Sequence, residues 1–206
     1  PATNFAAGGT NPGAVVAADF DLDGRSDLAL ANQDSGNVSV LRNLGAGGFS
    51  DVALMHAIER GEVEGPRIIP AGNAIGITGG HCDVTGFVPG VRERSPEEGV
   101  ADGPDQFVRA ARYQIKHGAK AIKVCATAGV FSFEGSVGAQ QMSAEELRAV
   151  VDEAARHGIR VAAHAHGPEG MIAAAKAGVT SIEHGSLLTD EAVRVLVEGH
   201  GTRLLI

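Results

Sequence analysis

The sequence has few aromatic residues, few cysteines and no long hydrophobic run. Aromatic side chains make up 4% of the 206 residues, and tryptophan is absent. No apolar run reaches the ~18 residues of a membrane-spanning helix, so we expect no membrane partner. The first residues, PATNFAAGG, contain neither a charged nor an apolar stretch of the kind that begins a signal peptide. With 44% apolar and 20% charged residues, the composition is that of a globular protein.

A cluster of positive charge is also missing. The formal net charge is −8, and no run of lysine or arginine occurs anywhere in the chain. Proteins that bind nucleic acid present a cationic stripe to the phosphates. We therefore predict no nucleic-acid partner and expect a small-molecule or peptide ligand.

The chain has two cysteines, Cys82 and Cys125. They form no CxxC pair, and two cysteines are too few for a disulfide framework. Cys125 lies in an apolar, strand-like run. We therefore predict a buried free thiol there.

The chain divides into two parts with different sequence patterns. Residues 1–50 are rich in Gly, Asn, Asp and Ser and show short apolar runs at 15–18, 28–31 and 38–41, which predicts an all-β segment. In residues 51–206, helical patterns alternate with short apolar strands. This alternation predicts an α/β domain with a parallel sheet. Its roughly 155 residues are fewer than the ~200 of a complete (β/α)₈ barrel, so a complete barrel does not fit comfortably; the family resemblance described below implies a partial TIM barrel.

Individual elements can be assigned in the second part. Ser143 and Glu146 form a capping-box pattern that begins one helix, and the pair His157–Gly158 ends it. Helices are also expected at 52–60, 104–117, 168–178 and 189–198. Strands are expected at 67–70, 121–126, 159–164, 180–184 and 203–206.

The stretch IRVAAHAHG ends a predicted strand with two histidines. In a strand, Val161 and Ala163 point to one face, whereas His164 and His166 point to the other. Imidazole is the commonest metal ligand and a base near neutral pH. The alternative is one histidine hydrogen-bonded in a core and one at the start of a loop.

Two neighbouring strands carry similar signals. Lys123 lies in mid-strand in AKAIKVCATAGV, and His184 ends the strand of SIEHGS. Lysine is almost never fully buried without a partner, and sites gather at the C-terminal edge of parallel sheets. Two imidazoles and a lysine on adjacent strands fit a divalent metal such as Zn²⁺.

The stretch DFDLDGRSD near the N-terminus is acidic. Its carboxylates are spaced as oxygen ligands of Ca²⁺ would be in a tight loop that bends at a glycine. The twelfth position of this loop is Leu30, so the loop is not an EF-hand. The alternative is a solvated acidic turn. The residues concerned are Asp19, Asp21, Asp23 and Asp27.

The stretch AVVAADFDLDGRSDLALANQDSGNVSVLRNLGAGGF resembles one FG-GAP/VCBS repeat, the calcium-binding unit of integrin-type β-propellers. This resemblance covers residues 5–49. It implies that the four aspartates, with the Arg25 carbonyl, coordinate Ca²⁺.

Residues 52–206 resemble the middle of an amidohydrolase-superfamily enzyme of the imidazolonepropionase-like, Xaa-Pro dipeptidase type. The stretches that carry the resemblance are PRIIPAGNAIGITGGHCD, ADGPDQFVRAARYQIKHGAKAIKV, VAAHAHGPEG and GVTSIEHGSLL. The resemblance implies a metal-dependent TIM barrel that hydrolyses amide, peptide or ester bonds. It implies that Lys123 is carboxylated by CO₂ and ligates metal together with His164 and His184. His81 and His166 are then substrate-binding residues.

The sequence departs from the family pattern in ways that affect function. The family's HxH pair on strand one and its aspartate on strand eight have no counterpart, and Cys82 replaces a glycine. The remaining ligands, Lys123, His164 and His184, match the ligand count of a catalytic zinc site. An incomplete barrel exposes sheet edges, which predicts a homo-oligomer. The alternative function is a Ca²⁺-dependent binding or adhesion module with an inactive α/β part.

Overall fold

The computed structural model describes three strands before residue 42 and then residues 49–130, 135–198 and 202–205. The chain forms two compact units, Pro1–Gly72 and Asn73–Ile206. Each unit is described separately below. Among the described residues, no helix has the length and apolar character needed to cross a membrane.

The first unit contains a small antiparallel sheet and one helix. The strands are β1 (Pro12–Ala18), β2 (Asp27–Asn32) and β3 (Asn37–Leu41), paired in the order β1-β2-β3. They confirm the three strands predicted from apolar alternation. Helix α1 (Ser50–Glu59) follows. The Asp51 carboxylate accepts the backbone N–H groups of Ala71 and Gly72 at 2.8 and 2.9 Å, which ties the end of the unit to the start of its helix.

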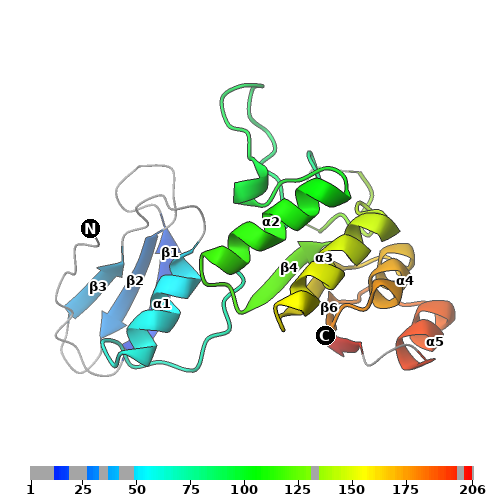
Figure 1. Ribbon diagram of the computed structural model, residues 1–206. Coiled ribbons are helices and arrows are strands. Elements are labelled where there is room, and N and C mark those ends of the chain that lie inside the picture. The colour runs from blue at the N-terminus through cyan, green and yellow to red at the C-terminus, as the bar shows by residue number, and fades with distance from the viewer. Residues whose placement is uncertain are drawn as a thin grey trace. The chain divides into compact units, whose positions relative to one another are not determined.

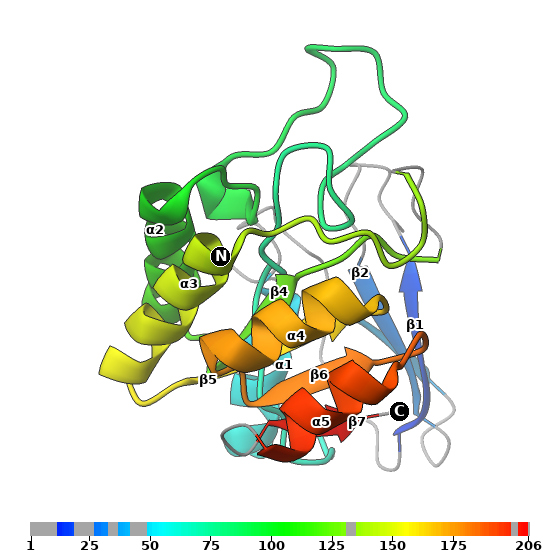
Figure 2. The ribbon, with the colours of Figure 1, turned by 90° about the vertical axis from the view of Figure 1, so that its right-hand side faces the viewer.

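The second unit is an α/β fold with a parallel sheet in the order β4-β5-β6-β7. Helices α2, α3, α4 and α5 follow one another along the sheet (Figures 1 and 2). This is the predicted partial TIM-barrel core. The elements are η1 (Pro96–Glu98), α2 (Pro104–Lys116), β4 (Ala121–Cys125), α3 (Ala144–Arg156), β5 (Arg160–Ala165), α4 (Pro168–Ala177), β6 (Ser181–His184), α5 (Asp190–Glu198) and β7 (Arg203–Leu205).

One core lies between the sheet and its helices. Alternate residues of each strand enter it, and the apolar stripes of α2, α3 and α4 meet them there, as the helical spacing requires. Burial of such side chains supplies about 1.5–3 kcal/mol each. The polar residues between them therefore lie on the other face of the sheet. Core members include Ile122, Val124, Val161, Ala163, Ile182, Phe107, Leu147, Val150 and Met171.

The strand predicted at residues 67–70 is wrong. That stretch has no strand structure, and the two prolines at 66 and 70 remove backbone donors that a ladder would need. Ile75 pairs with β4 instead: its N–H donates to the Lys123 carbonyl, and its own carbonyl accepts the Cys125 N–H, both at 2.8 Å. The segment after Gly72 therefore extends the parallel sheet beyond β4.

The predicted capping box of α3 is confirmed. The Ser143 hydroxyl accepts the Glu146 N–H at 3.2 Å, and the Glu146 carboxylate accepts the Ser143 N–H at 2.8 Å. Glu146 also accepts the N–H of Gly103, the residue that precedes α2, at 2.9 Å. One carboxylate therefore accepts hydrogen bonds from backbone N–H groups at the N-termini of two adjacent helices.

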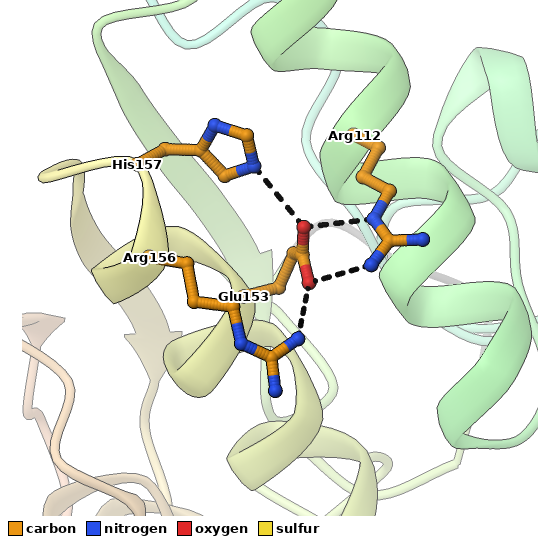
Figure 3. A network of polar contacts seen from close by, with 4 residues as sticks. All are labelled: Arg112, Glu153, Arg156 and His157. Atoms are coloured by element: carbon orange, nitrogen blue, oxygen red, sulfur yellow. Dashed lines mark hydrogen bonds and ion pairs between the residues drawn. The ribbon is translucent and has the colours of Figure 1, made fainter.

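A buried carboxylate ties α2 to α3. Glu153 is 2% exposed. Arg112, on α2, donates Nε and Nη2 to its two oxygens at 2.7 and 3.0 Å, Arg156 donates at 2.9 Å, and His157 Nε2 lies at 3.1 Å (Figure 3). The hydrogen bonds from Arg112, opposed by burial and reinforced by His157 and Arg156, lower the pKa of Glu153 to about 2. The cations are themselves exposed, so solvent screens part of this interaction.

We expect Glu153→Gln to lower the free energy of unfolding at neutral pH by about 1–2 kcal/mol, after discounting for solvent screening. The folded-state pKa is depressed, so the stabilisation is present above the unfolded-state value of ~4.3. It is lost as the pH falls towards 2. Urea titrations of both proteins at pH ~7 and pH ~2.5 measure this. The exposed carboxylate of Glu62 is the control, since Glu62→Gln should change nothing measurable. A difference between Glu153→Gln and the wild type that persists at the acidic pH would contradict the prediction.

Candidate functional site

The C-terminal ends of β4, β5 and β6 bring three predicted site residues to one edge of the sheet. The register pairs Cys125 with His164 and Ala165 with His184, and all three strands run parallel. Lys123 lies two residues before Cys125 and so shares its face. The register therefore places Lys123 and His164 on the same face of neighbouring strands and puts His184 opposite Ala165.

Four histidines gather at this edge. The His164 ring is central: its centroid lies 4.1 Å from that of His81, 4.7 Å from that of His166 and 4.8 Å from that of His184. The rings of His166 and His184 stack at 4.9 Å. His164 and His166 are each 5% exposed, whereas His184 is exposed. The site is thus a buried imidazole group with one open side.

The geometry of three of these rings fits a divalent metal ion. One ligand atom each from His164, His166 and His184 lies within 4.8 Å of the others. The Nε2 atom of His164 is buried and has no hydrogen-bond partner within the part of the chain that the structure describes. A buried polar atom without a partner is costly, and coordination of a cation would satisfy it. Imidazole nitrogens suit Zn²⁺ and other first-row transition metals.

A left-handed backbone turns His184 at the end of β6. His184 has a φ of 78°, a conformation that costs a non-glycine residue free energy. Strict alternation would place His184 on the core face with Ile182, because the two residues are two positions apart. Gly185, with a φ of 58°, continues the turn, and a side chain there would overlap Leu204. The strained turn therefore takes His184 out of the strand pattern and into the histidine group.

The electrostatics keep the central imidazole neutral. Burial, followed by the neighbouring His81, His166 and His184, lowers the pKa of His164 to about 3. Burial is also the main cause that lowers the pKa of His166. At neutral pH both rings therefore keep a free lone pair, which is the form that binds metal.

Two hydroxyl groups orient His166. Its Nδ1 lies 3.0 Å from the Ser186 hydroxyl, and its backbone N–H donates to the Thr127 hydroxyl at 3.0 Å. The hydrogen bond at one ring nitrogen determines what the other nitrogen can do. Sequence reasoning missed Ser186 and Thr127. The only signal for Ser186 was its place two residues after His184, which does not identify His166 as its partner.

Lys123 lies on the site face of β4 beside small residues. The register pairs it with Ala162. Burial lowers the pKa of the Lys123 amine, and Glu183 partly opposes this. Glu183 in turn accepts a hydrogen bond from the Ser181 hydroxyl at 2.7 Å. A depressed pKa increases the fraction of the neutral, reactive amine.

The prediction of a free thiol at Cys125 is wrong. Cys82 and Cys125 form a disulfide, with their Cα atoms 6.0 Å apart. The two residues are 43 positions apart in the sequence, and only the fold brings the segment that contains Cys82 against β4. The disulfide lies next to the site, because Cys82 follows His81 directly.

The N-terminal candidates cannot be placed in this site. Asp19, Asp21, Asp23 and Arg25 lie outside the described residues, and Asp27 is described only as part of the β2 backbone. The proposed Ca²⁺ loop therefore remains a prediction. Phe131, Phe133 and Glu134 of the glycine-rich loop after β4 also lie outside the described residues.

A groove of about 900 Å³ lies elsewhere, on α3, α4 and the start of α5. Its lining includes Arg148, Lys176, Glu169 and Glu191, but none of the four histidines. Charges of both signs on exposed helix surfaces are ordinary solvated side chains. We therefore assign the candidate site to the sheet edge and not to this groove.

Comparisons with known proteins identify the family of the chain. Residues 34–201 match the sequence profile of the amidohydrolase family. The chain is 38% identical over 155 residues to ochratoxinase of Aspergillus niger, an alignment that covers 69% of this chain and 32% of that protein. The chain is also similar to the crystal structure of a Xaa-Pro dipeptidase with bound methionine in the active site, with a TM-score of 0.74 and 42% sequence identity. This match covers 78% of our chain and 40% of the dipeptidase chain. A crystal structure of a prolidase complexed with N-methylphosphonate-L-proline is similar as well, with a TM-score of 0.66 and 38% sequence identity. This match covers 77% of our chain and 40% of the prolidase chain.

The chain spans about a third of the length of its curated relative and two fifths of these solved structures. The family match itself covers well over half of the chain. Together with the parallel sheet and the histidines at its C-terminal edge, it shows that this chain belongs to the amidohydrolase family.

Proposed function

We propose that the second unit carries the metal-binding half of a hydrolase that cleaves amide or peptide bonds, and ester bonds as a further class. The observation that carries the proposal is the buried Nε2 atom of His164, whose ring lies against three other imidazoles and for which the described residues provide no hydrogen-bond partner. The chain belongs to the amidohydrolase family, and one similar structure is that of a Xaa-Pro dipeptidase. A small amide or peptide is therefore the substrate class we propose here.

His164, His184 and Lys123 are the ligands that we propose for a divalent ion, with Zn²⁺ as the expected metal. A bound ion of this kind would polarise a carbonyl oxygen and lower the pKa of water. The role proposed for Lys123 requires its amine to add to CO₂, which forms a carbamate and releases a proton. The lowered pKa of Lys123 supports this, since only the neutral amine reacts.

His81 and His166 are the residues proposed to contact the substrate. Both rings lie against His164, and His166 is oriented by Ser186. If the Ser186 hydroxyl donates to Nδ1 of His166, then Nε2 carries the proton and can donate it to a substrate oxygen. If Nδ1 donates instead, Nε2 has a free lone pair and can join the metal ligands. The two arrangements place His166 in different roles.

Exposed apolar surface on α5 supports a further proposal, that the chain forms a homo-oligomer. Within the described part of the chain, β7 pairs on one side with β6. Val193 and Val197 of α5 are 43% and 81% exposed, so part of that helix's apolar surface is uncovered. Exposed edges and apolar surface favour association. A single monomeric species in sedimentation would contradict this proposal.

The proposed function is tested by counting metal. After equilibration with Zn²⁺ and gel filtration, we expect about one equivalent per chain by elemental analysis, as for a single catalytic-type site. Lys123→Ala and His184→Ala should each lose most of it, and bicarbonate should raise the loading of the wild type but not of Lys123→Ala. Hydrolysis of a panel of dipeptides should then require the metal. Binding of Ca²⁺ alone would instead favour the Ca²⁺-dependent binding module.

A further inference from the structure

The disulfide connects the segment that carries His81 to the strand that carries Lys123. Cys82 directly follows His81 in the sequence, and Cys125 is the residue of β4 that the register pairs with His164. Gly76 lies against both cysteines: a Cβ there would be 3.0 Å from the Cβ of Cys82 and 3.6 Å from that of Cys125. The absence of a side chain at residue 76 therefore leaves the room in which the two cysteines meet.

The ring of His81 packs closely against its neighbours. It stacks on His164, with a centroid distance of 4.1 Å and an interplanar angle of 26°. A side chain at Gly129 would overlap the His81 ring, so the backbone of residue 129 also lies close to it. Nδ1 of His81 is buried and has no hydrogen-bond partner among the described residues. The ring is therefore placed by packing and by the chain on either side of it.

Ile75 pairs the start of this segment with β4, and for residues 78–84 the disulfide is the link to that strand among the described contacts. The His81 N–H donates to the Gln141 side chain at 2.9 Å, which is a single neutral hydrogen bond. The Asp83 carboxylate accepts the N–H groups of Gly79 and Val84, which lie in the same short segment. The Cys82–Cys125 bond is the covalent link between the segment and the strand.

We propose that the Cys82–Cys125 disulfide is a redox-sensitive tie that positions His81 against His164. A thiolate of a reducing dithiol attacks one sulfur, releases the other cysteine as a thiol and forms a mixed disulfide; its second thiol then releases the remaining cysteine and leaves the reductant oxidised. Without this bond residues 78–84 are no longer tied to β4, although Ile75 stays paired with it, and His81 then moves away from His164 and opens the histidine group. Cys82 and Cys125 are thus positioning residues. The proposal concerns the place of one side chain and holds whether or not the chain hydrolyses an amide.

The test measures how fast His81 reacts. The chain is oxidised with glutathione disulfide, and mass spectrometry establishes the peptide crosslinked through Cys82 and Cys125. Histidine modification by diethylpyrocarbonate is then followed residue by residue, with and without a phosphine reductant. We expect reduction to raise the rate at His81 by about fivefold or more, in line with a local opening. The exposed His56 should react equally in both forms, and circular dichroism should show that the chain remains folded.

Cys82→Ser provides the second arm. Without reductant it should react at His81 as fast as the reduced wild type, and reductant should not change it further. An unchanged His81 rate on reduction, or an oxidised chain without the crosslinked peptide, would overturn the proposal. Loss of the whole fold on reduction would also overturn the proposal, because the disulfide would then stabilise the entire domain and not specifically the position of His81. If Cys82→Ser does not fold, the reduced wild type decides between these outcomes.

Discussion

Replacement of His164 by alanine is expected to weaken Zn²⁺ binding by at least ~100-fold. Loss of residues that only orient metal ligands costs about 10–100-fold in affinity, so loss of a central ligand should cost no less. His164 is central because its ring lies within 4.8 Å of three other imidazole rings. It is also the ring whose buried Nε2 atom has no other partner. The measurement is a competition titration against a chromophoric chelator at neutral pH.

Two controls make this result specific. His56→Ala removes an exposed histidine of α1 that pairs only with Glu59 among the described contacts, and it should not change the affinity. His164→Gln keeps most of the side-chain volume and is used if the alanine variant does not fold. A change within about threefold for a folded His164 variant, which is under 1 kcal/mol, would contradict the metal assignment.

The same titration assigns His166. As a ligand, it should match the loss seen for His164 and His184. If His166 binds substrate instead, its replacement by alanine should leave the Zn²⁺ affinity largely intact and change only the hydrolysis of an amide substrate. The structure favours neither role by distance alone, because all three ligand atoms lie within 4.8 Å of one another.

The sequence was sufficient for the parts of the fold that follow from local pattern. The capping box of α3 and the three N-terminal strands formed where apolar spacing and turn residues predicted them. The placement of Lys123, His164 and His184 on adjacent parallel strands of one sheet was also predictable, since the alternation of helices and strands indicates such a sheet. In these cases local propensity and the fold agree.

Contacts between segments distant in the sequence were not predictable in the same way. The pairing of Ile75 with β4 rests on two hydrogen bonds, a signal too short to show as strand periodicity. The apolar residues around Cys125 suggested a buried free thiol. Its disulfide partner lies 43 residues away in the sequence, so no local pattern indicates the pairing. Arg112, the partner of Glu153 on α2, and Ser186 and Thr127, the partners of His166, also come from other elements. Such interactions depend on tertiary packing, which spacing along one element does not report.

The disulfide should also contribute strongly to stability. Crosslinking across a separation of 43 residues removes chain entropy from the unfolded state, which corresponds to about 4 kcal/mol in the loop-closure description. Cys125 is 3% exposed and lies in the central sheet, so its thiol form is buried beside residues that are already packed. We expect Cys82→Ser/Cys125→Ser to unfold at a melting temperature roughly 10 °C below that of the oxidised wild type.

Thermal and urea unfolding of three samples separate the effect of the crosslink from that of the substituted side chains. The reduced wild type should fall close to the double serine variant, because both lack the loop constraint, and reductant should leave the double variant unchanged. A typical domain is stable by 5–15 kcal/mol, so both uncrosslinked forms should still be folded at room temperature. Equal urea midpoints for oxidised and reduced wild type would show that the bond does not constrain the unfolded chain. A melting temperature of the serine variant well below that of the reduced wild type would instead assign the difference to the buried hydroxyl at residue 125, which lacks the apolar character of a thiol.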